Sequence, residues 1–323
     1  MPLHDFSTNS NACGPCPSAL VAVRAADSSR YPDPSYGFLR QQLAEFHAVQ
    51  LDRIVLAASA SEFIFRITSL CALQGGRGIS LPRCSYGDYA EAAGVWGLQT
   101  VDRLADAQLH WACEPSSPLG TADERLPALM DLLETVPGHT VLDRAYEPLR
   151  LSGRPVLTHA QLQSVWQLYS PNKALGLTGI RGAYAIAPVG AGAHVQALEQ
   201  LCPSWPLGVH GVALLQAWTQ AETRAWLADS RAKLSEWKTR QVAMCEALGW
   251  HCLPSDTNFY GVQPVLPPSI AWDEALSRLR AAGIKLRDTA SFGLPGHARI
   301  SVQPPERQVA LRQAWTQLVK ACR

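Results

Sequence analysis

Short apolar, β-rich runs alternate with helical stretches through the middle of the chain, and this alternation constrains the fold most. Strands are expected over 53–57, 78–81, 100–103, 109–113, 140–142, 165–169 and 183–187, with helices over 62–73 and 86–94. Such an alternation favours an α/β fold with a mainly parallel sheet covered by helices on both faces. Ligands of such sheets bind at the carboxyl ends of strands, so residues just after the strands are the candidates for a site.

The pattern changes after Pro206. Residues 209–248 contain no proline and are rich in Ala, Leu, Gln, Arg and Trp, which predicts one long helix. Strands are expected over 257–262 and 298–302, with helices over 272–282 and 305–322. This second part reads as a smaller α+β domain joined to the first by the long helix. The first 30 or so residues have no strong period.

Composition excludes several classes of protein. Of the 323 residues, 47% are apolar and 17% are charged, which suits a chain with a sizeable core. The net charge of +1 gives no basic excess for a nucleic-acid partner. No apolar run reaches the roughly 18 residues of a membrane span, and the first residues do not resemble a secretory signal. The nine scattered cysteines fit reduced thiols in a cytoplasmic protein.

The segment 170–184 is the most informative for chemistry. A strand-like run ends at Ser170, Lys173 follows three residues later, and Arg181 lies in a glycine-rich stretch beyond it. Lysine forms Schiff bases with aldehyde cofactors, and Ser170 and Arg181 could together hold a phosphate. The blander alternative is an exposed loop lysine. The S-x-x-K spacing also occurs in serine β-lactamases, but their other motifs are absent.

A second segment ends another predicted strand with an acid. Asp143 follows an apolar run, and Tyr146 lies three residues further on. A carboxylate here could pair with a protonated pyridine nitrogen while the tyrosine bonds the ring's phenolic oxygen. Taken alone, an aspartate that caps the next helix is the better interpretation.

Together with the segments 5–15, 31–40, 58–62 and 86–89, these motifs resemble the fold-type I pyridoxal-phosphate enzymes of the class I/II aminotransferase superfamily. The similarity covers nearly the whole chain, and its motifs occur in family order. Histidinol-phosphate aminotransferase and threonine-phosphate decarboxylase are the most similar members. The resemblance implies a three-layer α/β/α large domain with a mainly parallel sheet, plus a smaller α+β domain.

The resemblance also implies domain limits. Residues 1–34 would form an N-terminal segment that packs on the small domain and on a dimer partner. Residues 35–205 would form the cofactor-binding large domain, 206–250 the long connecting helix, and 251–323 the C-terminal small domain. The family builds each site from two subunits, so a homodimer is expected.

Pyridoxal 5′-phosphate is the cofactor that the resemblance implies, and no metal is expected. Lys173 would carry the Schiff base, Asp143 would pair with the ring nitrogen, and Tyr146 would bond the ring oxygen. Arg299 would bind the substrate carboxylate, with Asn9 beside the substrate. The other cofactor contacts would come from Ala60, Ser61, Tyr86, Ser117, Ser170, Arg181 and, reaching in from the neighbouring subunit, Tyr31.

Several residues depart from the family pattern. Ser117 stands where an asparagine normally bonds the ring oxygen, so that contact could be lost or carried by water. Arg144 replaces the acid that usually follows the strand aspartate. Cys13 and Cys16 have thioredoxin-type spacing but no strand before them, which favours an ordinary turn. These departures leave the Lys, Asp and Arg set intact.

Three functions follow from the resemblance. The first is a pyridoxal-phosphate-dependent aminotransferase that exchanges an amino group between an amino acid or amino-alcohol phosphate and a 2-oxo acid. The second is a decarboxylase of the threonine-phosphate type, as in cobalamin synthesis. The third is a degenerate, non-catalytic protein with this fold. The candidates for binding a substrate phosphate are Arg24, Arg144, Arg150 and Arg154.

Overall fold

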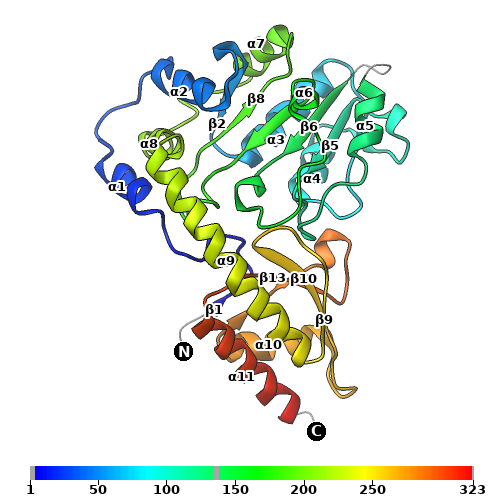
Figure 1. Cartoon of the computed structure of the whole chain (residues 1–323). Helices are drawn as coiled ribbons and strands as arrows, with labels where there is room; N and C mark the ends of the chain where they lie inside the picture. The colour runs from blue at the N-terminus through cyan, green and yellow to red at the C-terminus, as the bar shows by residue number, and fades with distance from the viewer. Residues whose placement is uncertain (1–3, 134–137, 322–323) are drawn as a thin grey trace.

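A seven-stranded sheet forms the centre of the larger domain in the computed structural model, which describes residues 4–133 and 138–321 (Figure 1). Its strand order is β2-β8-β7-β6-β5-β3-β4, and every neighbouring pair is parallel except those made by β8. The strands are β2 (Ile54–Ala57), β3 (Gly78–Ser80), β4 (Gln99–Thr100), β5 (Leu109–Cys113), β6 (His139–Asp143), β7 (Trp166–Tyr169) and β8 (Ala183–Ile186). The expected mainly parallel α/β sheet is confirmed.

Helices cover both faces of this sheet because both faces are apolar. They are α1 (Pro17–Ala25), α2 (Gly37–His47), α3 (Ala60–Leu73), α4 (Gly87–Val95), α5 (Leu126–Leu133), α6 (His159–Leu162), α7 (Gly192–Gln200) and α8 (Val209–Trp218). Alternate residues of a strand point to opposite faces. In β2, Val55 and Ala57 pack with α3, α4 and α7, whereas Ile54 and Leu56 pack with α1, α2 and α8. This arrangement gives three layers.

The prediction of a single helix over 209–248 is wrong, because the chain forms two helices there. Helix α8 ends at Trp218, and α9 (Ala221–Ala247) begins after a short break. The Thr219 hydroxyl donates to the Gln216 carbonyl at 2.8 Å and closes α8, while Gln220 has an extended backbone with ψ of 145°. Neither residue is a proline or glycine, so the sequence gives no signal for the break. Helix α9 then runs from the large domain to the small one (Figure 1).

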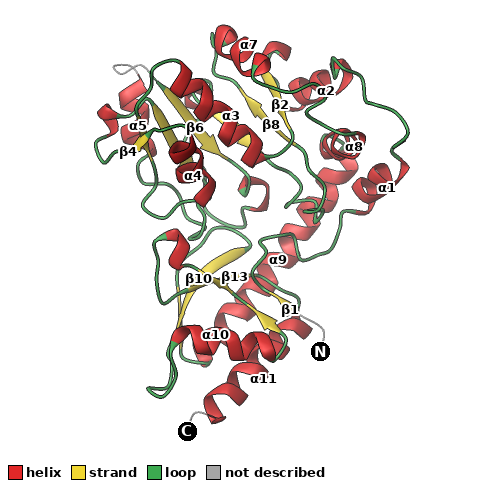
Figure 2. Cartoon of the chain, turned by 180° about the vertical axis from the view of Figure 1, so that it is seen from behind, coloured by secondary structure: helices red, strands yellow, loops and turns green. Residues whose placement is uncertain are grey.

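The small domain contains a four-stranded antiparallel sheet with the order β12-β13-β10-β9 (Figure 2). Its strands are β9 (Trp250–Cys252), β10 (Phe259–Pro264), β12 (Arg287–Asp288) and β13 (Ala298–Ser301), and its helices are α10 (Trp272–Ala281) and α11 (Pro305–Ala321). Near the N-terminus, β1 (His4–Asp5) pairs in parallel with β11 (Ile284–Lys285). The chain therefore starts against the small domain before it crosses to α1.

The N-terminal crossing packs directly on the segment that contains Lys173. The Asn11 backbone N–H donates to the Lys173 carbonyl at 2.9 Å, and the Asn11 side-chain amide donates to the Ala174 carbonyl at 3.0 Å. Gly176 has a φ of +68°, and a Cβ there would lie 2.5 Å from the Gly14 carbonyl oxygen. Only glycine fits this close approach, so the two segments fix each other.

None of the described helices is long and apolar enough to span a membrane. No helix was expected within residues 1–30, because they show no strong hydrophobic period, yet α1 lies there. Its proline at the first helical position and its alanines and valines explain the helix.

Candidate active site

A cavity of about 250 Å³ lies where the carboxyl ends of the large sheet face the small domain. Most of the site residues expected from the sequence line it. They are Ala60, Ser61, Tyr86, Ser117, Asp143, Tyr146, Ser170, Lys173, Arg181 and Arg299. The first nine come from the large domain, and Arg299 comes from β13 of the small domain.

One end of the cavity is built to bind an anion. Ser59 is the N-cap of α3, and its hydroxyl accepts a hydrogen bond from the Glu62 N–H at 3.1 Å. The Arg181 guanidinium donates to the same hydroxyl at 2.6 Å. Ala60 and Ser61 form the first turn of the helix, whose N–H groups and dipole attract negative charge. A fixed cation at a helix N-terminus suits a phosphate.

Asp143 lies buried at the end of β6 in the middle of the cavity wall. Its Oδ2 accepts from the Tyr89 hydroxyl at 2.7 Å, and its Oδ1 accepts from the Ala145 N–H at 2.9 Å. Burial raises the pKa of the Asp143 carboxyl, while the two donors and the Lys173 charge act in the opposite direction. A buried carboxylate of this kind suits a cationic ring nitrogen.

Lys173 lies close to the aromatic groups of the cavity. Its Nζ is 5.4 Å from the centre of the Tyr146 ring. The Asn9 side-chain amide donates to the Tyr146 hydroxyl at 3.4 Å, and the buried Asn9 Oδ1 has no hydrogen-bond partner. Tyr86 is 38% exposed, and its hydroxyl lies 3.4 Å from the Ser61 hydroxyl. Asn9 thus reaches the site through Tyr146 rather than by lining the cavity.

Ser117 contacts Arg299 in this structure. The Arg299 Nη1 donates to the Ser117 hydroxyl at 3.0 Å, and the Nη2 donates to the Ser7 carbonyl at 2.9 Å. The Nε of this buried guanidinium has no partner, and burial lowers the pKa of Arg299. The departure at position 117 therefore affects the arginine end of the cavity. Near Lys173, the polar groups are then the Tyr146 hydroxyl and the Asn9 amide that donates to it.

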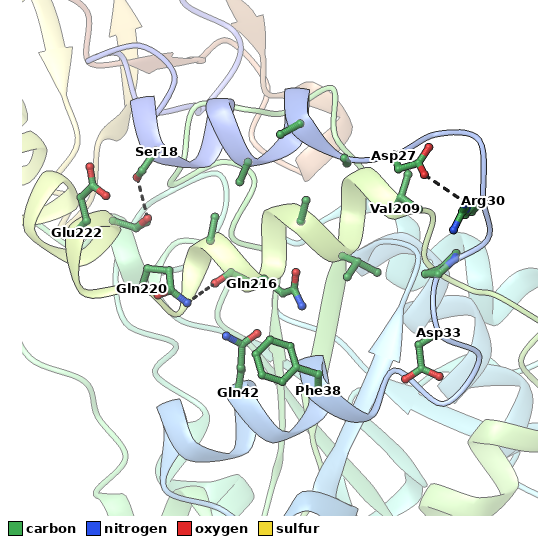
Figure 3. A pocket seen from close by; sticks show the side chains of 18 of the residues that line it. Ser18, Asp27, Arg30, Asp33, Phe38, Gln42, Val209, Gln216, Gln220 and Glu222 are labelled. Atoms are coloured by element: carbon green, nitrogen blue, oxygen red, sulfur yellow. Dashed lines mark hydrogen bonds and ion pairs between the residues drawn. The ribbon is translucent and has the colours of Figure 1, made fainter.

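Tyr31 lies outside this cavity. It is 77% exposed, stacks on Trp205 at 4.5 Å, and borders a separate groove of about 900 Å³ between α1, α2 and α8. Figure 3 shows Phe38 and Gln42 of α2 facing Gln216 of α8 across this groove. Within one chain, Tyr31 does not join the other expected site residues.

The four arginines expected to bind a substrate phosphate do not line the cavity. Arg150 is held by ion pairs with Glu114 at 3.1 Å and Glu147 at 2.9 Å. Arg144 donates to Gln167 at 2.9 Å and lies over the Tyr169 ring. Arg24 and Arg154 are exposed elsewhere. Within one chain, none of the four arginines joins the cavity, and the side chains of Arg144 and Arg150 are already held by other partners.

Three residues of the site were not singled out from the sequence. Ser59 could have been found from its S-x-x-E spacing with Glu62, which marks a helix N-cap. Arg287 lines the cavity because β12 pairs it directly with Arg299 of β13, which places both side chains on one face. Tyr89 gave no signal of its own beyond its place three residues after Tyr86.

The described part of the chain contains no group of three or more His, Cys, Asp or Glu side chains suited to a metal ion. The eight cysteines within it are free thiols. Cys16 is the N-cap residue of α1, and the Cys13 sulfur lies 3.7 Å from the Ser230 carbonyl. The two thiols therefore serve as packing groups in an ordinary turn.

The donor set of the cavity fits pyridoxal phosphate. The end at α3 and Arg181 would take the phosphate, and Asp143 would face the ring nitrogen. Lys173 offers an amine for the aldehyde, and the partnerless Arg299 Nε and Asn9 Oδ1 leave hydrogen-bonding capacity for a further ligand. Apart from Asn9, which contacts the cavity through Tyr146, these groups line one cavity, and Lys173 is the only lysine among its lining residues.

Sequence comparisons match the whole chain to one family. A family model described as "Aminotransferase class I and II" matches residues 2–313. A histidinol-phosphate aminotransferase from Symbiobacterium thermophilum is 28% identical, over 94% of this chain and 88% of that protein. An aromatic amino acid aminotransferase from Nocardia farcinica is 29% identical, over 96% of this chain and 90% of that protein.

Solved structures share the fold. The histidinol-phosphate aminotransferase of Sinorhizobium meliloti, solved in complex with pyridoxal-5′-phosphate, matches with a TM-score of 0.86 and 22% identity, over 100% of this chain and 92% of that one. The L-threonine-O-3-phosphate decarboxylase of Porphyromonas gingivalis matches with a TM-score of 0.80 and 20% identity, over 98% of this chain and 99% of that one. One fold therefore accommodates both reactions.

The contact between Arg181 and Ser59 generates a prediction about phosphate binding. Arg181→Gln should lower the affinity for pyridoxal phosphate by roughly tenfold or more, because a charge-assisted hydrogen bond is lost. Affinity for pyridoxal, which lacks the phosphate, should change little. Absorbance titration of the apoprotein measures both, with Arg240→Gln on the exposed face of α9 as the matched control. Equal losses for the two ligands would contradict a phosphate-binding role.

Proposed function

The chain belongs to the class I and II aminotransferase family, and from this premise we propose that it moves an amino group from an amino acid or amino-alcohol phosphate to a 2-oxo acid. Its cofactor is pyridoxal 5′-phosphate. The observation that carries the proposal is one cavity lined by an amine, Lys173, a buried carboxylate, Asp143, and a buried guanidinium, Arg299. The names of the curated relatives also favour amino transfer.

The residues have separate tasks in this reaction. Pyridoxal phosphate, when bound, supplies an aldehyde that condenses with amines and a ring that withdraws electrons from the carbon next to the nitrogen. Arg181, Ser59, Ser170 and the first turn of α3 would bind its phosphate. Asp143 would hold the proton on the ring nitrogen, and Tyr146 would hydrogen-bond the ring oxygen.

Arg299 and Lys173 would act on the substrate. Arg299 binds the α-carboxylate through two parallel N–H donors, and its contacts with Ser117 and Ser7 fix the guanidinium in place. Lys173 would hold the cofactor through its Nζ. The same Nζ is the general base that accepts the α-proton and returns a proton during transfer. Lys173 is the only lysine among the residues that line the cavity, so no other lysine competes for this role.

Arg287 supports a substrate with a second anionic group. It lines the cavity, pairs across the strands with Arg299, and its guanidinium lies 4.9 Å from the centre of the Phe292 ring. Its guanidinium donates to the Ser291 hydroxyl at 3.0 Å, which leaves further N–H donors for an anion. A phosphate at the far end of an amino acid or amino alcohol would suit this position.

The requirement for an amino-group acceptor tests the proposed reaction. The holoenzyme should convert a phosphorylated amino substrate only when a 2-oxo acid is supplied, with stoichiometric formation of the new amino acid. Chromatography of both products measures this exchange. Release of carbon dioxide without an acceptor would instead establish a decarboxylase, and neither product would leave the non-catalytic alternative.

Arg287→Gln tests the class of substrate. The KM for the phosphorylated substrate should rise by roughly tenfold, because one charge-assisted contact with the phosphate is lost. The KM for an unphosphorylated amino acid should not change. Steady-state kinetics with both substrates give the comparison, and Arg280→Gln, exposed at the end of α10, is the control. A rise of equal size for both substrates would contradict phosphate recognition.

A second copy of the chain is the proposed occupant of the groove between α1, α2 and α8. The groove is lined largely by apolar or small side chains, including Ala22, Phe38, Val212 and Ala213, and Phe38 is 65% exposed. Exposed apolar surface of this kind marks protein interfaces. Tyr31 lies on its edge, free to reach a neighbouring subunit, so a homodimer would bring it to a second cavity.

Tyr31→Phe tests this shared site. The dimer should persist, because the ring is kept, while affinity for pyridoxal phosphate falls by about tenfold through loss of one hydrogen bond to a charged group. Sedimentation and cofactor titration measure the two properties. An intact dimer with unchanged cofactor affinity would contradict the role of Tyr31, and a monomeric parent protein would contradict the interface.

A further inference from the structure

Among the tyrosines of the described residues, Tyr89 is the one that hydrogen-bonds to Asp143. It lies in α4, is fully buried, and donates its hydroxyl to Asp143 Oδ2 at 2.7 Å. Its ring stacks on Trp111 with centroids 4.4 Å apart and planes 9° from parallel, and Tyr86 packs against it edge-on at 5.8 Å. The hydroxyl is therefore held in position by the packing of the ring.

The hydroxyl of Tyr89 is one of only a few groups that face the Asp143 carboxylate in the described chain. The Ala145 N–H donates to the other oxygen at 2.9 Å, the Cys113 thiol lies alongside, and Lys173 is the nearby cation. Tyr89 and Ala145 thus bind one oxygen each and leave each oxygen a lone pair. That arrangement fixes the orientation of the carboxylate and leaves it able to accept a hydrogen bond from a further donor such as a protonated ring nitrogen.

We propose that Tyr89 is a positioning residue that keeps Asp143 ionised and oriented, so that the proton shared with the bound pyridine ring stays on the ring nitrogen. This inference rests on the proposed function, because it requires bound pyridoxal phosphate. Tyr89 also borders the cavity, and the effect of its hydroxyl on the ring nitrogen passes through Asp143.

Electrostatics explains why such a donor is needed. Burial raises the pKa of Asp143, and the Tyr89 hydrogen bond is the largest of the contributions that lower it. Without that donor the carboxylate becomes more basic and draws the shared proton away from the ring. A charge-assisted hydrogen bond would change this proton-sharing equilibrium by roughly ten- to a hundredfold. A ring with an unprotonated nitrogen withdraws electrons less strongly.

Tyr86 does not perform this task, although it lies only three residues away. Both tyrosines line the cavity, but their hydroxyls have different partners. The Tyr86 hydroxyl lies against the Ser61 hydroxyl, whereas the Tyr89 hydroxyl donates to the Asp143 carboxylate. Of these two tyrosines, only Tyr89 therefore acts on Asp143 through a hydrogen bond.

The nitrogen-15 resonance of labelled pyridoxal phosphate bound to the enzyme tests the proposal. It reports protonation of the ring nitrogen independently of turnover. In Tyr89→Phe, which keeps the ring and its stacking, the resonance should move downfield toward the position of unprotonated pyridine. In Tyr36→Phe, which removes the hydroxyl of another buried tyrosine that donates to the Leu207 carbonyl, it should not move.

A double-mutant comparison shows whether Tyr89 acts through Asp143. Asp143→Asn alone should move the resonance downfield, and adding Tyr89→Phe should move it no further. If Tyr89→Phe does not fold, 4-aminophenylalanine at position 89 retains the ring with a weaker donor and should give a smaller downfield movement.

Three further results would each contradict a different part of the proposal. An unmoved resonance in folded, cofactor-loaded Tyr89→Phe or in the 4-aminophenylalanine variant contradicts the role of Tyr89. A further shift in the double variant contradicts action through Asp143. Failure of the parent protein to bind pyridoxal phosphate contradicts the proposed function instead, and with it the basis of this inference.

Discussion

A carboxylate buried at the end of a central strand is the constraint on which the site depends. Asp143 is held away from water, and a charge in that position is costly unless donors or cations compensate it. The protein supplies the Tyr89 hydroxyl, the Ala145 N–H and the nearby Lys173 charge. The remaining capacity of the carboxylate is directed into the cavity. The buried charge of Asp143 is thus compensated within the fold, and the carboxylate favours a cationic ligand group in the cavity.

The cavity depends equally on two domains that are fixed to each other. The large sheet supplies the anion-binding end, Asp143 and Lys173, and the small antiparallel sheet supplies Arg287 and Arg299. The N-terminal chain pairs with β11 and then binds the backbone of Lys173 through Asn11. These connections place Arg299 of the small domain and Lys173 of the large domain in the same cavity.

Sequence reasoning predicted the strand-end residues well, because a parallel sheet brings the carboxyl ends of its strands to one edge. Asp143, Ser170 and Lys173 follow directly from that rule and lie in one cavity. Arg287 could not be found in this way, since its place depends on the register of a strand only two residues long. The break between α8 and α9 and the contact of Tyr89 with Asp143 depend on packing that no local signal encodes. Tyr31 lies outside the cavity of its own chain, so its proposed role depends on a second chain that no pattern within this sequence describes.

Reductive trapping of the cofactor tests the central claim, that Lys173 is the amine that binds pyridoxal phosphate. The purified protein is mixed with the cofactor, its visible spectrum is recorded, and borohydride reduction is followed by peptide mapping. The account predicts a visible band that reduction removes and a label on Lys173. Lys238 should stay unlabelled, because its amine is half-buried and donates to the Ser255 and Thr257 carbonyls. No band, or a label on other lysines with Lys173 unmodified, would contradict the account.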